Sequence, residues 1–102
     1  MPAVARGQSR DTVTTNHSPC STTTTTNACS SNVFVNDIGV HRQGDLNTTH
    51  SIPCGDSCCS HSVELTAGSD SVIVNGKGIA RVGDRYSGCG EVSTGSNNVF
   101  AN

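Results

Sequence analysis

The sequence predicts a small, mainly β protein in which three related β-hairpins close into a ring. The chain has 102 residues and a formal charge of −2, and only 32% of its residues are hydrophobic and 3% aromatic. This length leaves room for one small domain. With so few large apolar side chains, we expect a metal, disulfides or a partner to stabilise it. The fold class follows from an internal repeat and from a split copy of that repeat at the chain ends.

The repeat is found by aligning the chain with itself at an offset of 39 residues. Residues 32–45 then lie over residues 71–84, with seven identities in 14 positions. In each copy, short β-branched and aromatic runs flank Asn-Asp-Ile-Gly or Asn-Gly-Lys-Gly. Asn and Gly tolerate the positive φ of a tight hairpin turn, so each copy predicts a β-hairpin. The Arg and Asp near the end of each copy are expected to form structural ion pairs or hydrogen bonds to turn amides.

A third copy is divided between the two ends of the chain. Residues 98–102 repeat the strand at 32–36, and residues 3–6 resemble the strand that begins at 79. If the ends pair, the chain closes into a ring with pseudo-threefold symmetry and fewer open sheet edges. We therefore expect a single domain over 1–102, with repeat cores at 32–45 and 71–84 and a split repeat formed by 3–11 with 98–102.

The three connecting loops, 12–31, 46–70 and 85–97, leave from equivalent turns and should gather at one end of the ring. A candidate metal ligand lies five or six residues after the turn aspartate in each loop, and the longest loop supplies a second. One ligand per loop is what a site on the pseudo-threefold axis needs, and three His with one Cys fit a closed structural zinc site. The candidates are His17, His50, His61 and Cys89. A site with four protein ligands would be structural and not catalytic.

The remaining cysteines leave alternatives open. Cys54, Cys58 and Cys59, with Cys20 or Cys29, could form a second kind of zinc site, although adjacent cysteines rarely direct both sulfurs at one metal. They could equally be small neutral residues in long loops, or form two loop disulfides. His41 is replaced by Ala80 in the other copy, so we expect it to be a surface or packing residue.

Several function classes are disfavoured. A pI near 6.0 with six Lys and Arg argues against nucleic-acid binding. The sequence has no apolar run of membrane-spanning length, no nucleotide-binding loop and no nucleophile elbow. The first eleven residues contain no apolar stretch of the kind found in secretory signals. A small zinc hydrolase would need a general base beside an open metal position, and Glu64 and Glu91 are the only glutamates.

The sequence resembles the PAAR-repeat proteins over essentially its whole length. The resemblance is carried by MPAVAR at the start, VFVN and VIVN in the strands, IARVGD at 79–84 and TGSNNVFAN at the end. It implies a small cone that sits on the blunt end of a trimeric β-helical spike, VgrG-like or a phage central spike, in type VI secretion systems, phage tails and related injection particles. It also implies one structural Zn²⁺ near the vertex, held by three His and one Cys, which match the four candidates above.

A pseudo-threefold ring could meet a threefold spike with one chain per trimer and one hairpin per subunit. Such a tip is not an enzyme. It would contact a target membrane only transiently, and would be assembled in the bacterial cytoplasm before joining a virion tail or being exported into a target. The alternative is a disulfide-rich secreted binding module without metal, with three bridges. The expected spike contacts are apolar strand residues: Val33, Phe34, Val35, Val72, Ile73, Val74, Val99 and Phe100.

Overall fold

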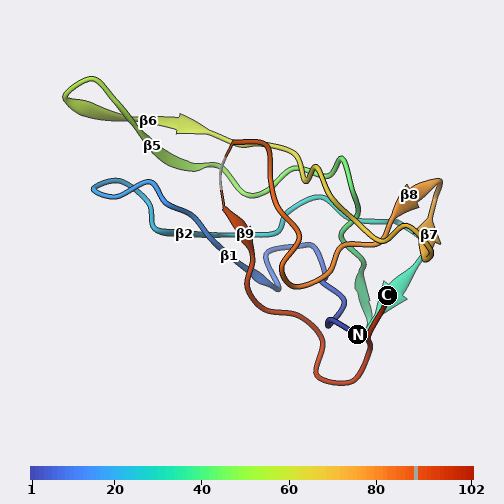
Figure 1. Ribbon diagram of the computed structural model, residues 1–102. Helices are drawn as coiled ribbons and strands as arrows, with labels where there is room; N and C mark the ends of the chain where they lie inside the picture. The colour runs from blue at the N-terminus through green and yellow to red at the C-terminus, as the bar shows by residue number, and fades with distance from the viewer. Residues whose placement is uncertain (89) are drawn as a thin grey trace.

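The computed structural model describes residues 1–88 and 90–102, and it confirms a mainly β fold (Figure 1). Its strands are short: β1 (Thr12–Thr14), β2 (Thr23–Thr25), β3 (Phe34–Val35), β4 (Ile38–Gly39), β5 (His50–Cys54), β6 (Ser57–His61), β7 (Ile73–Val74), β8 (Lys77–Gly78) and β9 (Glu91–Val92). Strands β2, β1 and β9 form one antiparallel sheet in that order, and β3–β4, β5–β6 and β7–β8 are two-stranded hairpins. In the described part of the chain, no helix has the length and apolar character needed to cross a membrane.

The two repeat hairpins form as their turn residues predict. The two residues between β3 and β4, Asn36 and Asp37, have φ of 54° and 68°, and Asn75 and Gly76 between β7 and β8 have 54° and 79°. Positive φ at both central positions gives the turn whose twist matches the flanking strands. The glycine that ends β4 is required for a different reason: a Cβ on Gly39 would collide with the neighbouring backbone carbonyl.

The two ends of the chain lie together and complete a third hairpin (Figure 1). Ala3 and Phe100 form an antiparallel bridge, and the Val4 amide donates to the Val99 carbonyl at 3.0 Å. The repeat hairpins have hydrogen bonds at the equivalent place. The Val40 amide donates to the Val33 carbonyl at 3.1 Å, and the Ile79 amide donates to the Val72 carbonyl at 2.9 Å. The three units are thus built on the same backbone pattern.

The three units are joined by a closed ring of backbone hydrogen bonds. The Ala5 amide donates to the Ala80 carbonyl at 2.9 Å, the Ala80 amide to His41 at 2.9 Å, and the His41 amide to Ala5 at 3.1 Å. All three residues are fully buried. This ring marks the pseudo-threefold axis of the molecule.

Each unit also carries the expected Arg–Asp pair. In the two intact copies the Asp carboxylate accepts hydrogen bonds from both the backbone amide and the guanidinium of an Arg three residues earlier. The split copy makes the same pair between Arg6 and Asp11, across a turn two residues longer. Gln8 and Ser9, both at positive φ, accommodate the extra length. The pairs are structural, as predicted, because each carboxylate is buried and satisfied.

The molecule is elongated, with extents of 42 × 23 × 22 Å, and it tapers toward the β5–β6 hairpin (Figure 1). Two small apolar clusters fill the wider part. The basal cluster contains Val4, Val35, Val40, Val74, Ile79 and Ala101. The middle cluster contains Ala5, Val13, Leu65, Ala80, Tyr86 and Val92. We call the end with the termini, β3–β4 and β7–β8 the base, and the end with β5–β6 and the β1–β2 loop the apex.

His41 is a packing residue and not a surface one. It is fully buried, its Nδ1 donates to the Ala28 carbonyl at 2.7 Å, and its Nε2 accepts from the Tyr86 hydroxyl at 2.7 Å. Burial lowers its pKa and the charge of Arg42 lowers it further, while the hydrogen bond to the Ala28 carbonyl and the charges of Asp45 and Asp11 partly oppose this. His41 is therefore neutral in the folded protein at pH 7.

We expect His41→Ala to destabilise the protein by about 2–4 kcal/mol at pH 7, through the lost volume and two unpaired hydrogen-bond partners. Because the folded-state pKa of His41 is lowered, the wild type loses stability as the pH falls below the unfolded value of about 6.5. The variant lacks this loss. The difference in the free energy of unfolding between the wild type and the variant should therefore shrink as the pH falls, by at most about 1.4 kcal/mol per pH unit. Denaturant unfolding at pH 7.5 and 5.5, with chelator present, measures it. A stability difference that grows on acidification would contradict the assignment of His41 as neutral in the folded protein.

Candidate metal centre

Two of the three histidines are positioned by the β5–β6 hairpin. His50 begins β5 and His61 ends β6, and the register pairs them directly across the two strands. Directly paired residues present their side chains on the same face about 5 Å apart. The Nδ1 of His50 donates to the Thr48 carbonyl at 2.9 Å, which fixes the tautomer and leaves Nε2 with its lone pair.

His17 reaches the same place from the loop between β1 and β2. Hydrogen bonds between Ser21 and Ser51 hold this loop beside β5, with their hydroxyls 2.8 Å apart. A disulfide between Cys20 and Cys58 holds it to β6. His17 and His50 are buried and His61 is half-buried, so the cluster is largely shielded from solvent.

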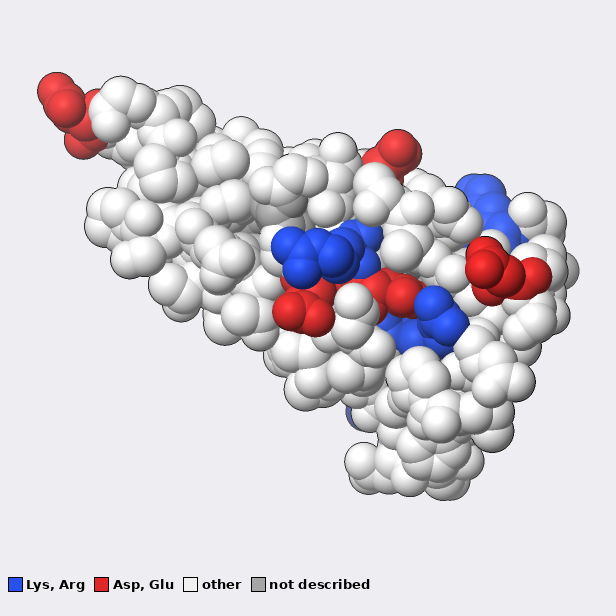
Figure 2. All heavy atoms as spheres, viewed as in Figure 1, with Lys and Arg blue, Asp and Glu red and all other residues white. Residues whose placement is uncertain are grey.

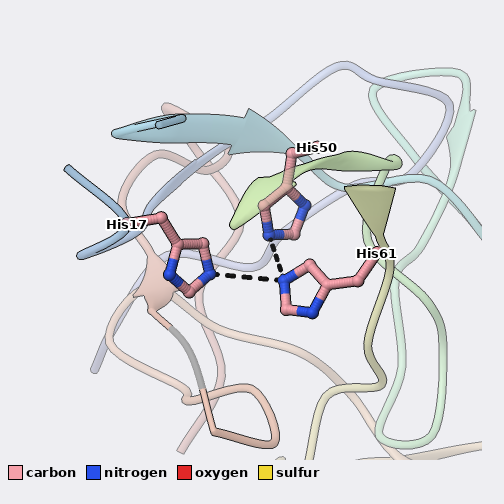
Figure 3. A group of neighbouring side chains, drawn as sticks. All are labelled: His17, His50 and His61. Carbon is pink, nitrogen blue, oxygen red and sulfur yellow. Dashed lines mark hydrogen bonds between the residues drawn. The ribbon is translucent and has the colours of Figure 1, made fainter. Parts of the chain in front are cut away.

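The three imidazole rings face one another and their Nε2 atoms converge (Figure 3). The Nε2 of His61 lies 2.8 Å from that of His50 and 3.3 Å from that of His17. A ligand atom from each of the three residues lies within 4.8 Å of the others. The predicted ligands His17, His50 and His61 are therefore brought together by the fold.

The hydrogen-bonding chemistry of this cluster fits a metal better than it fits histidines alone. The Nε2 of His50 has a lone pair that can accept one hydrogen bond. The Nε2 of His61 carries either one proton or one lone pair, so it cannot form a full hydrogen bond with both His50 and His17. A cation among the three nitrogens satisfies all of them. Two nitrogens bound to one tetrahedral zinc at 2.0–2.1 Å lie about 3.3 Å apart, close to the spacings found here.

Electrostatics also favour the neutral, ligating form. The pKa of His17 is lowered by burial and by the charge of His50. The pKa of His61 is lowered by burial and by both neighbouring histidines. Neutral imidazole is the form that binds metals, so these two side chains need not lose a proton at pH 7.

The fourth predicted ligand, Cys89, lies outside the described residues. Its neighbour Gly90 is buried, has a φ of 65° and packs so tightly on β1 that a Cβ would collide with the Thr14 carbonyl. Gly90 is therefore fixed against β1, the strand that leads to His17.

The proposal of a second, cysteine-dominated zinc site is wrong. Cys20 is bonded to Cys58 and Cys54 to Cys59, and Cys29 is a free thiol. Adjacent residues in a strand face opposite sides, so Cys58 and Cys59 cannot both turn to one metal. The alternative of two loop disulfides is correct. The sequence carries a signal for one of the two pairings: Cys20 follows His17 by three residues, and Cys58 precedes His61 by three.

The eight predicted spike contacts divide by face. Phe34, Ile73 and Phe100 occupy equivalent places in the three units and are 57%, 56% and 49% exposed. Val72 is also exposed, Val33 and Val99 pack partly on the basal cluster, and Val35 and Val74 are buried inside it. This division follows the alternation of side chains along a strand. Val35 and Val74 are therefore not accessible to a partner in this structure.

Comparison with known proteins identifies the family. The sequence model of the PAAR motif matches residues 10–87, which include most of the chain and the three clustered histidines. This is a PAAR-motif protein. The PAAR motif marks spike-tip proteins of injection systems, a structural family. No curated protein matches the chain.

We expect the PAAR-motif protein to purify with one zinc per chain, and His61→Ala to weaken zinc binding by more than about 100-fold. The reason is that removing a ligand should cost more than the 10–100-fold typical of removing a ligand's hydrogen-bond partner. Elemental analysis and competition with a chromophoric chelator measure the change. Ser60→Ala, the exposed neighbour in β6, is the matched control. Wild-type zinc content in His61→Ala would contradict the site.

Proposed function

We propose that this protein caps the blunt end of a trimeric β-helical spike as its tip, with the base against the spike and the apex pointing away. The observation that carries this proposal is the arrangement of Phe34, Ile73 and Phe100. They are large apolar side chains, they are about half exposed, and they occupy equivalent positions around the pseudo-threefold axis. Exposed apolar side chains gathered on one face commonly mark an interaction site.

The pseudo-threefold symmetry supports a threefold partner. Three hairpins of one chain can present three similar surfaces, so that each subunit of a trimer meets a similar hairpin. The backbone of the base is fixed by contacts between units, such as the Asn36 side chain donating to Asn98 at 2.9 Å and Asn75 donating to Asn32 at 3.0 Å. A base held in this way would dock with little rearrangement, which lowers the cost of binding.

The base combines exposed apolar side chains with charge. Figure 2 shows positive and negative groups intermingled over the middle of the molecule and again near the end that carries β7 and β8. Lys77, an exposed residue of β8, belongs to this end.

The apex needs another kind of stabilisation. The two buried apolar clusters end at the level of Val13, Leu65 and Val92, and most of β5–β6 is exposed. We propose that His17, His50, His61 and Cys89 hold one structural zinc, which would supply cross-links between loops and no catalysis. A structural zinc site contributes on the order of 10 kcal/mol to folding in small domains. Such a tip would resist unfolding while it is driven through a membrane.

We also propose that the protein is assembled on its spike in the bacterial cytoplasm and then carried in a virion tail or exported into a target. The alternative, a secreted binding module without metal, is favoured by the two disulfides alone. Three bridges were its signature, and Cys29 is free. Its other signature is a metal-free protein, so the zinc analysis above separates the two.

We expect the combined substitution Phe34→Ala, Ile73→Ala and Phe100→Ala to weaken binding to a recombinant trimeric β-helical spike by at least about 100-fold, because side chains central to an interface contribute about 2 kcal/mol or more. The substitution removes exposed groups, so stability should change little. Light scattering should give one chain per spike trimer, and titration calorimetry the affinity. Leu46→Ala, 46% exposed outside the three repeat positions, is the control. Three chains per trimer, or equal loss with the control, would overturn the proposal.

A further inference from the structure

Two connections join the same two segments at the apex. His17 lies three residues before Cys20, and His61 lies three residues after Cys58. The Cys20–Cys58 disulfide joins these segments with a Cα–Cα distance of 5.9 Å. The Nε2 atoms of His17 and His61 are 3.3 Å apart at the other end of the same segments. The disulfide and the histidine contact therefore close one small loop between them.

Of the three clustered histidines, only His17 depends on this disulfide for its position. His50 and His61 are direct partners in a five-residue antiparallel pairing, which holds their side chains on one face. His17 belongs to the β1–β2 loop, outside any strand. Its own carbonyl accepts from the Cys20 amide at 2.6 Å, so the position of Cys20 is transmitted directly to His17.

Among the described residues, few other contacts hold the β1–β2 loop against the hairpin. Ser21 and Ser51 exchange hydrogen bonds at 2.8–3.0 Å, while Pro19 and Ser18 are exposed. Neither buried apolar cluster includes a residue between Val13 and Val35. A segment held by a few part-buried hydrogen bonds and little apolar burial opens locally at low free-energy cost.

We infer that Cys20 and Cys58 are positioning residues of the metal centre, because their disulfide holds His17 in place as a ligand. The inference rests on the zinc site of the proposed function. It makes metal binding and disulfide formation two coupled equilibria. The disulfide raises the local concentration of the third imidazole at the other two, which is the effect of tethering one binding group to another.

The coupling is reciprocal. If the disulfide strengthens zinc binding by a given factor, zinc favours the disulfide over the two thiols by the same factor. The redox step is a thiol–disulfide exchange: the two thiols transfer two electrons and two protons to glutathione disulfide, and yield the protein disulfide and two glutathione thiols. A coupling of about 10- to 100-fold is expected for sites linked in this way.

The second disulfide provides a matched control within the same hairpin. Cys54 and Cys59 are five residues apart and join β5 to β6 without involving the β1–β2 loop. His50 and His61 already pair through the strands, so the loss of Cys54–Cys59 leaves the position of His17 unchanged. Both disulfides lie in the exposed apex, and their removal alters the two buried apolar clusters equally little.

The first experiment compares zinc dissociation constants, by chelator competition, for the oxidised wild type, Cys20→Ser/Cys58→Ser and Cys54→Ser/Cys59→Ser. We expect binding about 10- to 100-fold weaker in the first variant and changed less than about threefold in the second. In a His17→Ala background, Cys20→Ser/Cys58→Ser should cause no further loss, because the disulfide acts through His17. An equal further loss in that background would overturn the inference.

The second experiment uses the wild type alone, so it does not depend on a variant folding. The protein is equilibrated with glutathione buffers at a fixed free zinc concentration or with chelator, and Cys20–Cys58 is quantified by alkylation and mass spectrometry. Zinc should shift the equilibrium toward the disulfide by the same 10- to 100-fold. A shift toward thiols, or no shift while zinc binds tightly, overturns the inference and leaves the zinc site intact. A wild type that binds no zinc overturns both.

Discussion

The fold depends on the ring of three backbone hydrogen bonds among Ala5, His41 and Ala80. Each amide donates to the next unit, so no unit can be placed without the other two, and one of the three is itself assembled from the chain ends. The ring lies where the two clusters meet. Ala5 and Ala80 belong to the middle cluster, and the residue before each ring member belongs to the basal cluster: Val4, Val40 and Ile79. It converts three short hairpins, each too small to be stable alone, into one cooperative structure with buried backbone groups satisfied.

The stabilising interactions change in kind along the long axis. At the base, valine and isoleucine side chains fill the space between hairpins, and Ser30, Ser69 and Ser96 each accept backbone amide hydrogen bonds in equivalent positions. Toward the apex the cross-section narrows and apolar packing ends. Two disulfides, serine and threonine hydrogen bonds and the histidine cluster take its place, as expected where a segment is too thin to bury a core.

The sequence was sufficient for those features that the repeat determines, and insufficient for those that interrupt it. Identical residues at an offset of 39 predicted the two hairpins and the Arg–Asp pairs, and ligand spacing predicted which histidines would meet. Cysteine pairing is not determined by spacing alone, since the six cysteines of the sequence allow about fifteen connectivities. His41 was predicted to be a surface or packing residue, and the repeat could not decide between the two because its repeat equivalent is alanine. The partner of its Nε2, the Tyr86 hydroxyl, lies outside the two repeat cores.

Symmetry is kept at the base and lost at the apex, and the two ends have different physical requirements. The proposed threefold partner needs three similar surfaces, and the base has equivalent side chains in three units. The proposed metal and the disulfides need particular residues at single positions, and the β5–β6 hairpin supplies two histidines and three cysteines. The extra length of that one loop breaks the symmetry and lets one short chain combine a threefold base with a cross-linked point.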